Sequence, residues 1–565
     1  MEVTDVHSAD SEDDGPYRRT QRPMFWREST NDVVSFLAES DNLTIYVGAG
    51  VTVDQGGPSW TDLVHELTKD PLLDEKAVGP NDREMLTSVL TPLEASTTVA
   101  RYFRDALTGE DEDYINNVLI SAVRSRLYPG ARWNIGQLAR SIATLVAARF
   151  QSQLYTTIVT TNYDTILQRE LSEQLAEVGG GIDPGLLPNV QRLEDWTAGR
   201  QSDPQLAEMM YLHGQVPQFT GEPASRSIVF TENDYWRNRE RAFEYLKGVL
   251  NPPSSVLIIG SSLTDAPLLE ALLDKPTQDD SSRHSRIALF PIPSMVARAQ
   301  HDITKIQTKA LWDQYKTRMN AFGVQISVPD FYSSLSQFCD ELRLVTEHKN
   351  KVGIGSPKSY LERLSLWWSE WSDGVLRNGV RRREIDAWIH DIASSYMKLL
   401  SREDYEESLK IELWAVWNPS DERRLLKRWA NSAWPSSEWN DEDIANGEKM
   451  AREAEIVVNS NYAAIRALVT ARPLLDTINL DGRHNPVDSP HGSRWRQVLA
   501  VPISIETHGG RIAVGAVTLM SMASNSYLSE SHPTFLQSCV AVLRNVGQLS
   551  LDPEPVALGP TKSPV

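Results

Sequence analysis

Short apolar segments, separated by stretches of helical periodicity, constrain the fold of this chain more than any other feature. Seven of them are rich in β-branched or large apolar residues, at 44–47, 156–160, 208–212, 227–230, 255–259, 286–290 and 324–328. Several are apolar without alternation, as strands covered on both faces are. Helical patterns lie between them, for example at 62–69, 139–149 and 267–273. The alternation predicts an α/β fold with a mostly parallel, Rossmann-like sheet.

The remaining segments suggest where the domains begin and end. Residues 1–23 form an acidic leader with little to bury, and 24–346 are expected to form the first domain. Within that domain, residues 70–150 show helical periodicity and no strand pattern, which predicts a helical insert. The charged and then Gly/Ser/Pro-bearing stretch at 347–358 predicts a linker.

A second domain of α+β type is expected at 359–552, followed by a loose tail at 553–565. Its predicted elements are a helix at 385–400, strands at 411–417 and 423–430, a helix at 447–458, hairpin strands at 496–505 and 511–521 joined through His508-Gly509-Gly510, and a helix at 533–549. Ten of the 16 tryptophans follow residue 360. A core role for tryptophans such as Trp414 and Trp429 is favoured over stacking on a ligand.

Composition narrows the function. The chain has 56 Lys+Arg and 76 Asp+Glu, a formal net charge of −20, which argues against direct nucleic-acid binding. No apolar run approaches the ~20 residues of a membrane-spanning helix, and the acidic N-terminus is unlike a signal or transit peptide. Two cysteines, Cys339 and Cys539, are too few for a four-cysteine zinc site. We therefore expect a cytoplasmic protein without a bound metal.

Glycine and polar residues follow four of the predicted strands, at the end where open α/β sheets bind ligands. The four runs are Gly48–Thr52, Thr161–Asp164, His213-Gly214 and Gly260–Asp265. Glycines after a strand allow the backbone to approach a pyrophosphate, and an imidazole accepts a proton near neutral pH. Each run also has a purely structural interpretation, as a tight turn, a helix-capping Asx turn, a structural histidine or a helix N-cap.

In this order, the segments GAGVT with GGP, TTNYD, LHG and GSSLTD resemble the sirtuin-like NAD-binding family over residues ~30–340. The resemblance implies that Gly48, Ala49, Gly50 and Thr52 lie along the NAD pyrophosphate, and that Gly260, Ser261 and Ser262 contact the adenosine side. It further implies that Asn162 and Asp164 shape the nicotinamide side, with Asp164 binding the carboxamide. Asn162 would position water or a ribose hydroxyl, and His213 would be the base.

The chain departs from the protein-deacylating sirtuins at several positions. It lacks the cysteines of their zinc module, has Ser59-Trp60-Thr61 where they have Asp-Phe-Arg, and has Phe290-Pro291 where they have a ribose-binding Asn. Pro58-Ser59-Trp60 and the run at 229–235 instead resemble prokaryotic sirtuin-like NADases of antiviral defence. That resemblance implies an NAD glycohydrolase that releases nicotinamide and ADP-ribose or a cyclised product. A protein deacylase or ADP-ribosyltransferase and a non-catalytic sensor of an NAD derivative are the alternatives.

The strands LAVPI and GRIAVGAVTLMSM, with the helices around them, resemble a GAF-type sensor domain, although other antiparallel α+β folds share this pattern. The resemblance implies a pocket for a small ligand or a helix-mediated dimer. We expect a homo-oligomer in which this domain responds to a small-molecule or protein trigger and sets the active population of the first domain.

Overall fold

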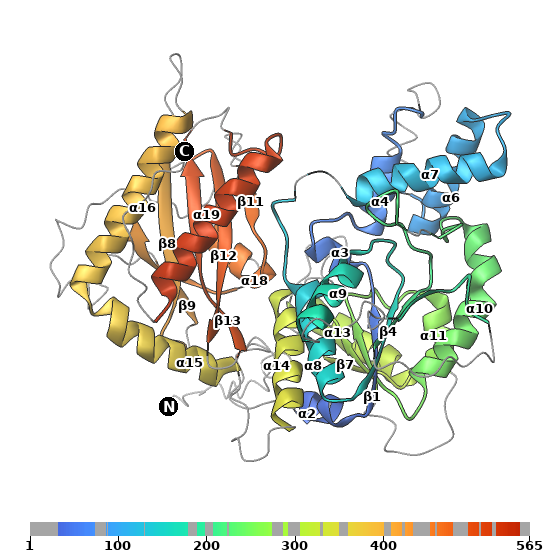
Figure 1. Ribbon diagram of the computed structural model, residues 1–565, viewed down its shortest axis with the longest axis horizontal. Helices are drawn as coiled ribbons and strands as arrows, with labels where there is room; N and C mark the ends of the chain where they lie inside the picture. Colours follow the sequence, from blue (N-terminus) through green and yellow to red (C-terminus); the bar gives the residue numbers. More distant parts are fainter. Residues whose placement is uncertain are drawn as a thin grey trace, which may run out of the picture.

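The computed structural model describes residues 32–553 apart from several internal segments (Figure 1). The longest of these segments are 80–85, 179–188, 198–206, 274–285, 292–304, 350–359, 401–407, 433–452 and 478–494. The predicted leader and most of the predicted tail lie outside the described residues. Figure 1 shows two sheet-containing halves side by side, which correspond to the N-terminal and C-terminal parts of the chain.

The N-terminal half is built on a seven-stranded sheet with the order β3-β4-β2-β1-β5-β6-β7, in which every pairing is parallel. Its strands are β1 Asn42–Val47, β2 Tyr155–Thr160, β3 Asn189–Arg192, β4 Ala207–Tyr211, β5 Ser255–Ile259, β6 Arg286–Leu289 and β7 Gln325–Ser327. β5 is buried along its whole length, as its unbroken apolar sequence predicts. The Rossmann-like parallel sheet is confirmed.

Two details of the strand prediction are wrong. Residues 227–230 form no strand, because Ile228 and Phe230 are buried in the core of the helical cap instead of pairing in the sheet. The edge strand β3 lies in a stretch where no strand is predicted. Its sequence NVQR is polar and only partly buried, so it carries no apolar signal.

Helices cover both faces of the first sheet. α2 Asp32–Glu39, α8 Leu138–Gln151, α9 Ile166–Val178 and α14 Ser333–Lys349 share a core with one face. α10 Glu232–Leu250, α11 Ala266–Leu273 and α13 Lys305–Ala321 cover the other face, and the short helix α3 Gly50–Asp54 follows β1.

A separate helical cap is formed by α4 Trp60–Leu67, α6 Pro92–Ala106 and α7 Glu112–Leu127, which have their own apolar core. The described part of the predicted insert is therefore helical, but α8 at its C-terminal end belongs to the sheet layer. Within the described ranges, no helix combines the length and apolar character needed to cross a membrane.

The C-terminal half contains a six-stranded antiparallel sheet with the order β10-β9-β8-β13-β12-β11. Its strands are β8 Leu409–Trp417, β9 Leu425–Asn431, β10 Glu453–Glu455, β11 Leu474–Thr477, β12 Gln497–Thr507 and β13 Gly510–Ser521. Its helices are α15 Tyr360–Trp371 with a π-helical turn at Ser372–Leu376, α16 Gly379–Leu400, α18 Ala463–Thr470 and α19 Pro533–Leu551. Gly510 begins β13, and the other two residues of the predicted hairpin turn lie outside the described residues.

The predicted helix at 447–458 is wrong where the chain is described. Residues 453–455 pair with β9 as an edge strand, and Ala454 is buried between two exposed glutamates. Tertiary pairing overrides the helical propensity of this run, and residues 447–452 lie outside the described ranges. The core role favoured for the tryptophans is confirmed for Trp414 and Trp429, which are both buried in the main core of this half.

The two halves contact each other directly. α14 packs on the first sheet and also against β13 and α18 of the second half. Arg511 on β13 donates to Gln137 Oε1 at 2.6 Å. Arg472, which follows α18, donates from Nη1 to the carbonyl of Val53 at 2.9 Å. The C-terminal half therefore holds the end of α3, the helix that begins at the Gly48–Gly50 run. At the predicted linker, α14 extends to Lys349, and 350–359 lie outside the described residues.

Asp54 is the last residue of α3 and lies at this contact. Its carboxylate accepts the backbone N–H of Leu138 at 2.8 Å. Burial raises the pKa of Asp54 to about 6, while the Leu138 bond and the nearby Arg472 guanidinium act in the opposite direction. The folded protein therefore holds a proton on Asp54 more tightly than an unfolded chain does.

This raised pKa predicts a pH dependence of stability. The contribution of Asp54 is fully present below the unfolded pKa of ~4 and is lost as the pH rises through about 6. Asp54→Asn does not titrate here, so it lacks this loss of stability. The difference in the free energy of unfolding, variant minus wild type, should therefore increase by on the order of 2 kcal/mol from pH 4 to pH 7. Urea denaturation at both pH values measures the change. Asp391→Asn, on the exposed surface of α16, controls for the loss of one negative charge. A difference for Asp54→Asn that stays constant across this range would contradict the prediction.

Candidate functional site

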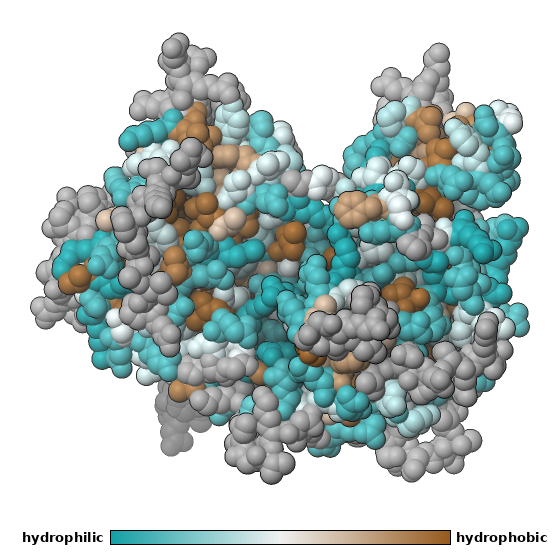
Figure 2. Space-filling model, in the orientation of Figure 1, coloured by the Kyte–Doolittle hydropathy of each residue, from teal (hydrophilic) through white to brown (hydrophobic). Residues whose placement is uncertain are grey.

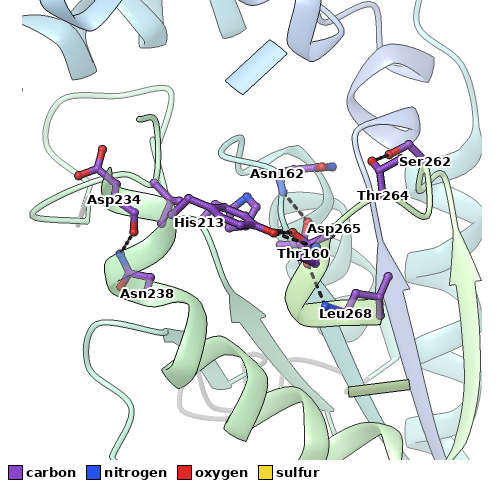
Figure 3. A network of polar contacts seen from close by, with 12 residues as sticks. Thr160, Asn162, His213, Asp234, Asn238, Ser262, Thr264, Asp265 and Leu268 are labelled. Carbon is purple, nitrogen blue, oxygen red and sulfur yellow. Dashed lines mark hydrogen bonds and ion pairs between the residues drawn. The ribbon is translucent and has the colours of Figure 1, made fainter. Parts of the chain in front are cut away.

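The sheet order brings the four predicted runs to one edge. They follow β4, β2, β1 and β5, which are consecutive neighbours in the parallel sheet, so their carboxyl ends lie together. The chain places β2, β3 and β4 on one side of β1 and then crosses to β5 on the other side. Such a switch point is where open α/β sheets form their ligand crevice. Figure 3 shows Asn162, His213, Asp265 and Ser262 at this edge.

The glycines of the first run allow the loop after β1 to approach the loop after β5 closely. The N–H of Gly50 donates to the carbonyl of Gly260 at 2.8 Å. A Cβ on Gly48 would lie 2.5 Å from the Cα of Ser261, and one on Gly50 would lie 2.8 Å from the Cα of Gly260. Gly260 has a φ of +66°, which favours glycine. These glycines let the β1 and β5 loops stack, a reason that differs from the expected approach to a pyrophosphate. Their predicted role in NAD binding stays a prediction, as does that of the exposed Ala49 between Gly48 and Gly50.

The serines after β5 hydrogen-bond within their own loop. Ser261 Oγ accepts the N–H of Leu263 at 3.1 Å, and Ser262 Oγ lies 2.6 Å from Thr264 Oγ1. Ser262 is exposed and Ser261 is half-buried. Contact of these two residues with the adenosine side of NAD remains a prediction.

Thr52 and Asp164 bind each other. The Thr52 hydroxyl donates to Asp164 Oδ2, and Asp164 Oδ1 accepts the N–H of Ile166 at 3.0 Å. Both side chains are buried. These contacts tie α3 to the start of α9 and match the helix-capping interpretation of Asp164. Nothing tests the ligand roles predicted for the two residues.

Asn162 has an unusual set of contacts. Its Nδ2 donates to the carbonyl of Gly48 at 3.1 Å, and its backbone N–H donates to Thr160 Oγ1 at 3.0 Å. Its Oδ1 is buried and accepts no hydrogen bond in the described structure. A buried acceptor without a partner costs about 1–3 kcal/mol. This oxygen is therefore left to accept a donor from a ligand.

His213 follows β4, and a backbone hydrogen bond from a segment distant in sequence holds it in place. Its carbonyl accepts the N–H of Val229 at 2.9 Å, and Gly214 adopts a φ of +93°. The side chain retains 19% exposure, and its Nε2 lies 3.8 Å from Asp265 Oδ1. Burial lowers the pKa of His213, and the Asp265 charge partly offsets that effect. At neutral pH the ring is therefore a neutral base.

Three further residues of this edge are not among the predicted site residues. Asp265 ends the GSSLTD run, of which only Gly260, Ser261 and Ser262 are among the predicted site residues. Tyr235 presents its ring to His213 with centroids 6.1 Å apart, and Tyr46 lies inside β1. The aspartate was visible as part of a motif, but a strand-interior tyrosine carries no sequence signal of this kind. Among the residues that the structure describes, no group of three His, Cys, Asp or Glu side chains is placed to hold a metal ion.

Comparison with known proteins finds a family match within the N-terminal half. Residues 156–319 match the SIR2-like domain family. These residues are similar to SIR2-like domains. The matched segment includes β2, β4 and β5 with Asn162, His213 and Asp265, and the sirtuin-like resemblance is thereby confirmed. The GAF-like resemblance of the C-terminal half is not confirmed.

A curated relative is the NAD(+) hydrolase ThsA of Enterococcus faecium, which is 24% identical to this chain over 240 residues. The alignment covers 42% of this chain and 40% of the relative. The similarity therefore spans less than half the length of either protein.

The stacking of the two glycine loops generates a prediction. Gly50→Ala places a methyl group against the backbone of Gly260, which cannot move as a flexible side chain would, and should lower the free energy of unfolding by about 1–3 kcal/mol. Gly248→Ala is the matched control, because Gly248 lies in α10 with open space around it. That change should raise stability by up to about 1 kcal/mol. Denaturant titration measures the free energy of unfolding of both variants. Equal changes in that free energy would argue against the loop contact.

Proposed function

We propose that this protein is an NAD glycohydrolase that uses NAD as substrate. It cleaves the bond between nicotinamide and ribose and releases nicotinamide with ADP-ribose or a cyclised product. The observation that carries the proposal is the buried Asn162 Oδ1, which has no hydrogen-bond partner among the described residues. Asn162 follows β2 and His213 follows the neighbouring strand β4, both within the segment that matches the SIR2-like family. The name of the relative from Enterococcus faecium supports the same chemistry.

The residues suit this reaction. As the bond from nicotinamide to ribose C1′ breaks, its electron pair leaves with the nicotinamide nitrogen and positive charge develops on the ribose. Asn162 Oδ1 would accept a hydrogen bond from a ribose hydroxyl or from the attacking water and hold it in place. His213 would take the proton that water loses as its oxygen bonds to C1′. In the cyclised product, a nitrogen of the adenine would attack in place of water.

We further propose that the enzyme is a gated effector of antiviral defence, active in the cytoplasm as a homo-oligomer. The Pro58-Ser59-Trp60 form supports the defence role. A GAF-like C-terminal half would respond to a small-molecule or protein trigger, and the Arg472 contact with Val53 offers a physical route to the site. Through this contact, a change in the C-terminal half reaches α3 and the adjoining Gly48–Gly50 loop.

The alternatives make different predictions. A deacylase would need an acylated peptide, and this chain has only two cysteines where such enzymes use four for zinc. A non-catalytic sensor would bind NAD and leave it intact. Incubation of the pure protein with NAD alone, followed by measurement of nicotinamide, separates both from a hydrolase.

The assignment of the two central residues is testable by substitution. Asn162→Ala and His213→Ala should each lower the rate of nicotinamide release by about 10²–10⁴-fold, since each removes one positioned group. Asn238→Ala is the control, because the side-chain hydrogen bond that the structure describes for Asn238 stays within α10, on the carbonyl of Asp234. Melting temperatures establish that the variants fold. Full activity of the Asn162 and His213 variants at wild-type stability would mean that the two residues are structural.

The coupling between the halves is testable in the full chain. Removing the C-terminal half would uncover the face of α14 that packs on β13, so a point variant is the cleaner probe. Arg472→Ala frees the end of α3 and should raise the KM for NAD by about three- to tenfold through the loss of one charged hydrogen bond. Arg377→Ala removes an exposed arginine of the same half that pairs with Asp373, and it should leave KM unchanged. Identical kinetics for the two variants would count against the proposed route.

A further inference from the structure

We infer that Asp265 is the positioning residue of His213: it orients the imidazole and stabilises the positive charge that the ring acquires when it accepts a proton. The inference rests on the proposed NAD glycohydrolase function and assigns a role within that same site.

The geometry of the carboxylate supports this role. Asp265 Oδ1 lies 3.8 Å from His213 Nε2 and accepts the hydroxyl of Tyr235 at 3.2 Å. Asp265 Oδ2 accepts the hydroxyl of Tyr46 at 3.3 Å. Two donors from β1 and α10 thus fix the carboxylate beside the ring, and Figure 3 shows it next to His213. With Nε2 on the side of Asp265, Nδ1 is the ring nitrogen left to accept the proton.

The tyrosines keep their protons. The Tyr235 hydroxyl makes two hydrogen bonds here: it donates to Asp265 Oδ1 and accepts the N–H of Ala266 at 2.8 Å. Burial and the neighbouring Asp265 charge raise the pKa of both Tyr46 and Tyr235, so both remain neutral donors. Asp265 is then the charged group that acts on the ring of His213.

The effect of this charge opposes that of burial. Burial disfavours the imidazolium and lowers the pKa of His213, whereas a carboxylate within ~4–6 Å favours it. Without Asp265 the ring would be a weaker base. The carboxylate therefore keeps a buried histidine basic enough to take a proton from water or a ribose hydroxyl.

A structural role has to be separated from this one. Asp265 also caps α11, because its Oδ2 accepts the N–H of Leu268 at 3.2 Å. Asparagine caps a helix about as well as aspartate, and serine nearly so. Asp265→Asn and Asp265→Ser therefore retain a capping oxygen while removing the charge, and two variants of different size guard against one that misfolds.

The experiment measures the pKa of His213 by NMR titration of the imidazole signals in the full-length protein. Comparison with His213→Gln assigns the signal among the 11 histidines. In both Asp265 variants the pKa of His213 should fall by about one unit. Asp234→Asn is the matched control: it removes the carboxylate that caps α10 nearby, and it should leave that pKa unchanged.

Kinetics provide the second readout. In Asp265→Asn, kcat for nicotinamide release should fall at least about tenfold with little change in KM, and the acidic limb of the pH profile should move to lower pH. A His213 pKa within about 0.3 unit of wild type in both folded Asp265 variants would overturn the inference. Failure of the wild-type protein to release nicotinamide would overturn the proposed function instead, and the NMR titration would still report whether Asp265 acts on His213.

Discussion

The site depends on the close contact between the loop after β1 and the loop after β5. Parallel pairing of these strands brings Gly48 and Gly50 against Gly260 at backbone distance, and the N–H of Gly50 closes the contact. Any side chain at these glycines would separate the loops. Because α3 begins at Gly50 and α11 follows the Gly260 loop, the same contact sets where both helices start. Asn162 is attached to the first of these loops through the carbonyl of Gly48, and Asp265 caps α11.

The polar side chains around this contact are of two kinds: some are paired with other protein groups, and one has an oxygen available to a ligand. Asp164 accepts hydrogen bonds from the hydroxyl of Thr52 and from the N–H of Ile166, which holds α3 against α9. Asn162 Nδ2 donates a hydrogen bond to the carbonyl of Gly48, whereas its Oδ1 has no partner among the described residues. A buried acceptor in that state is stabilised when a ligand supplies a donor. The polar residues at this edge thus differ in kind, although the sequence presents them as one set of motifs.

The C-terminal half contributes to the same region. Its sheet has an apolar core of its own, yet Arg472 and Arg511 reach across to α3 and to the segment that leads into α8. Asp54 lies between those two attachments, with its carboxylate on Leu138. The apolar residues visible on the surface in Figure 2 are scattered among hydrophilic ones on both halves, as is normal for a protein surface. The halves are joined by the packing of α14 against β13 and α18 and by the polar contacts of Arg472 and Arg511.

The amino-acid sequence by itself determined six of the seven strands of the first sheet, all but the edge strand β3, together with the helical character of the described insert and the motifs at the strand ends. These rest on local patterns, namely unbroken apolar runs, helical periodicity and glycine after a strand. Tertiary structure decided the rest. Residues 453–455 form a strand because they pair with β9. Residues 227–230 form no strand because their apolar side chains lie in the core of the helical cap. Only the fold brings Asp265 to His213 and Arg472 to Val53, because each pair joins residues far apart in the chain and their contact depends on strand order.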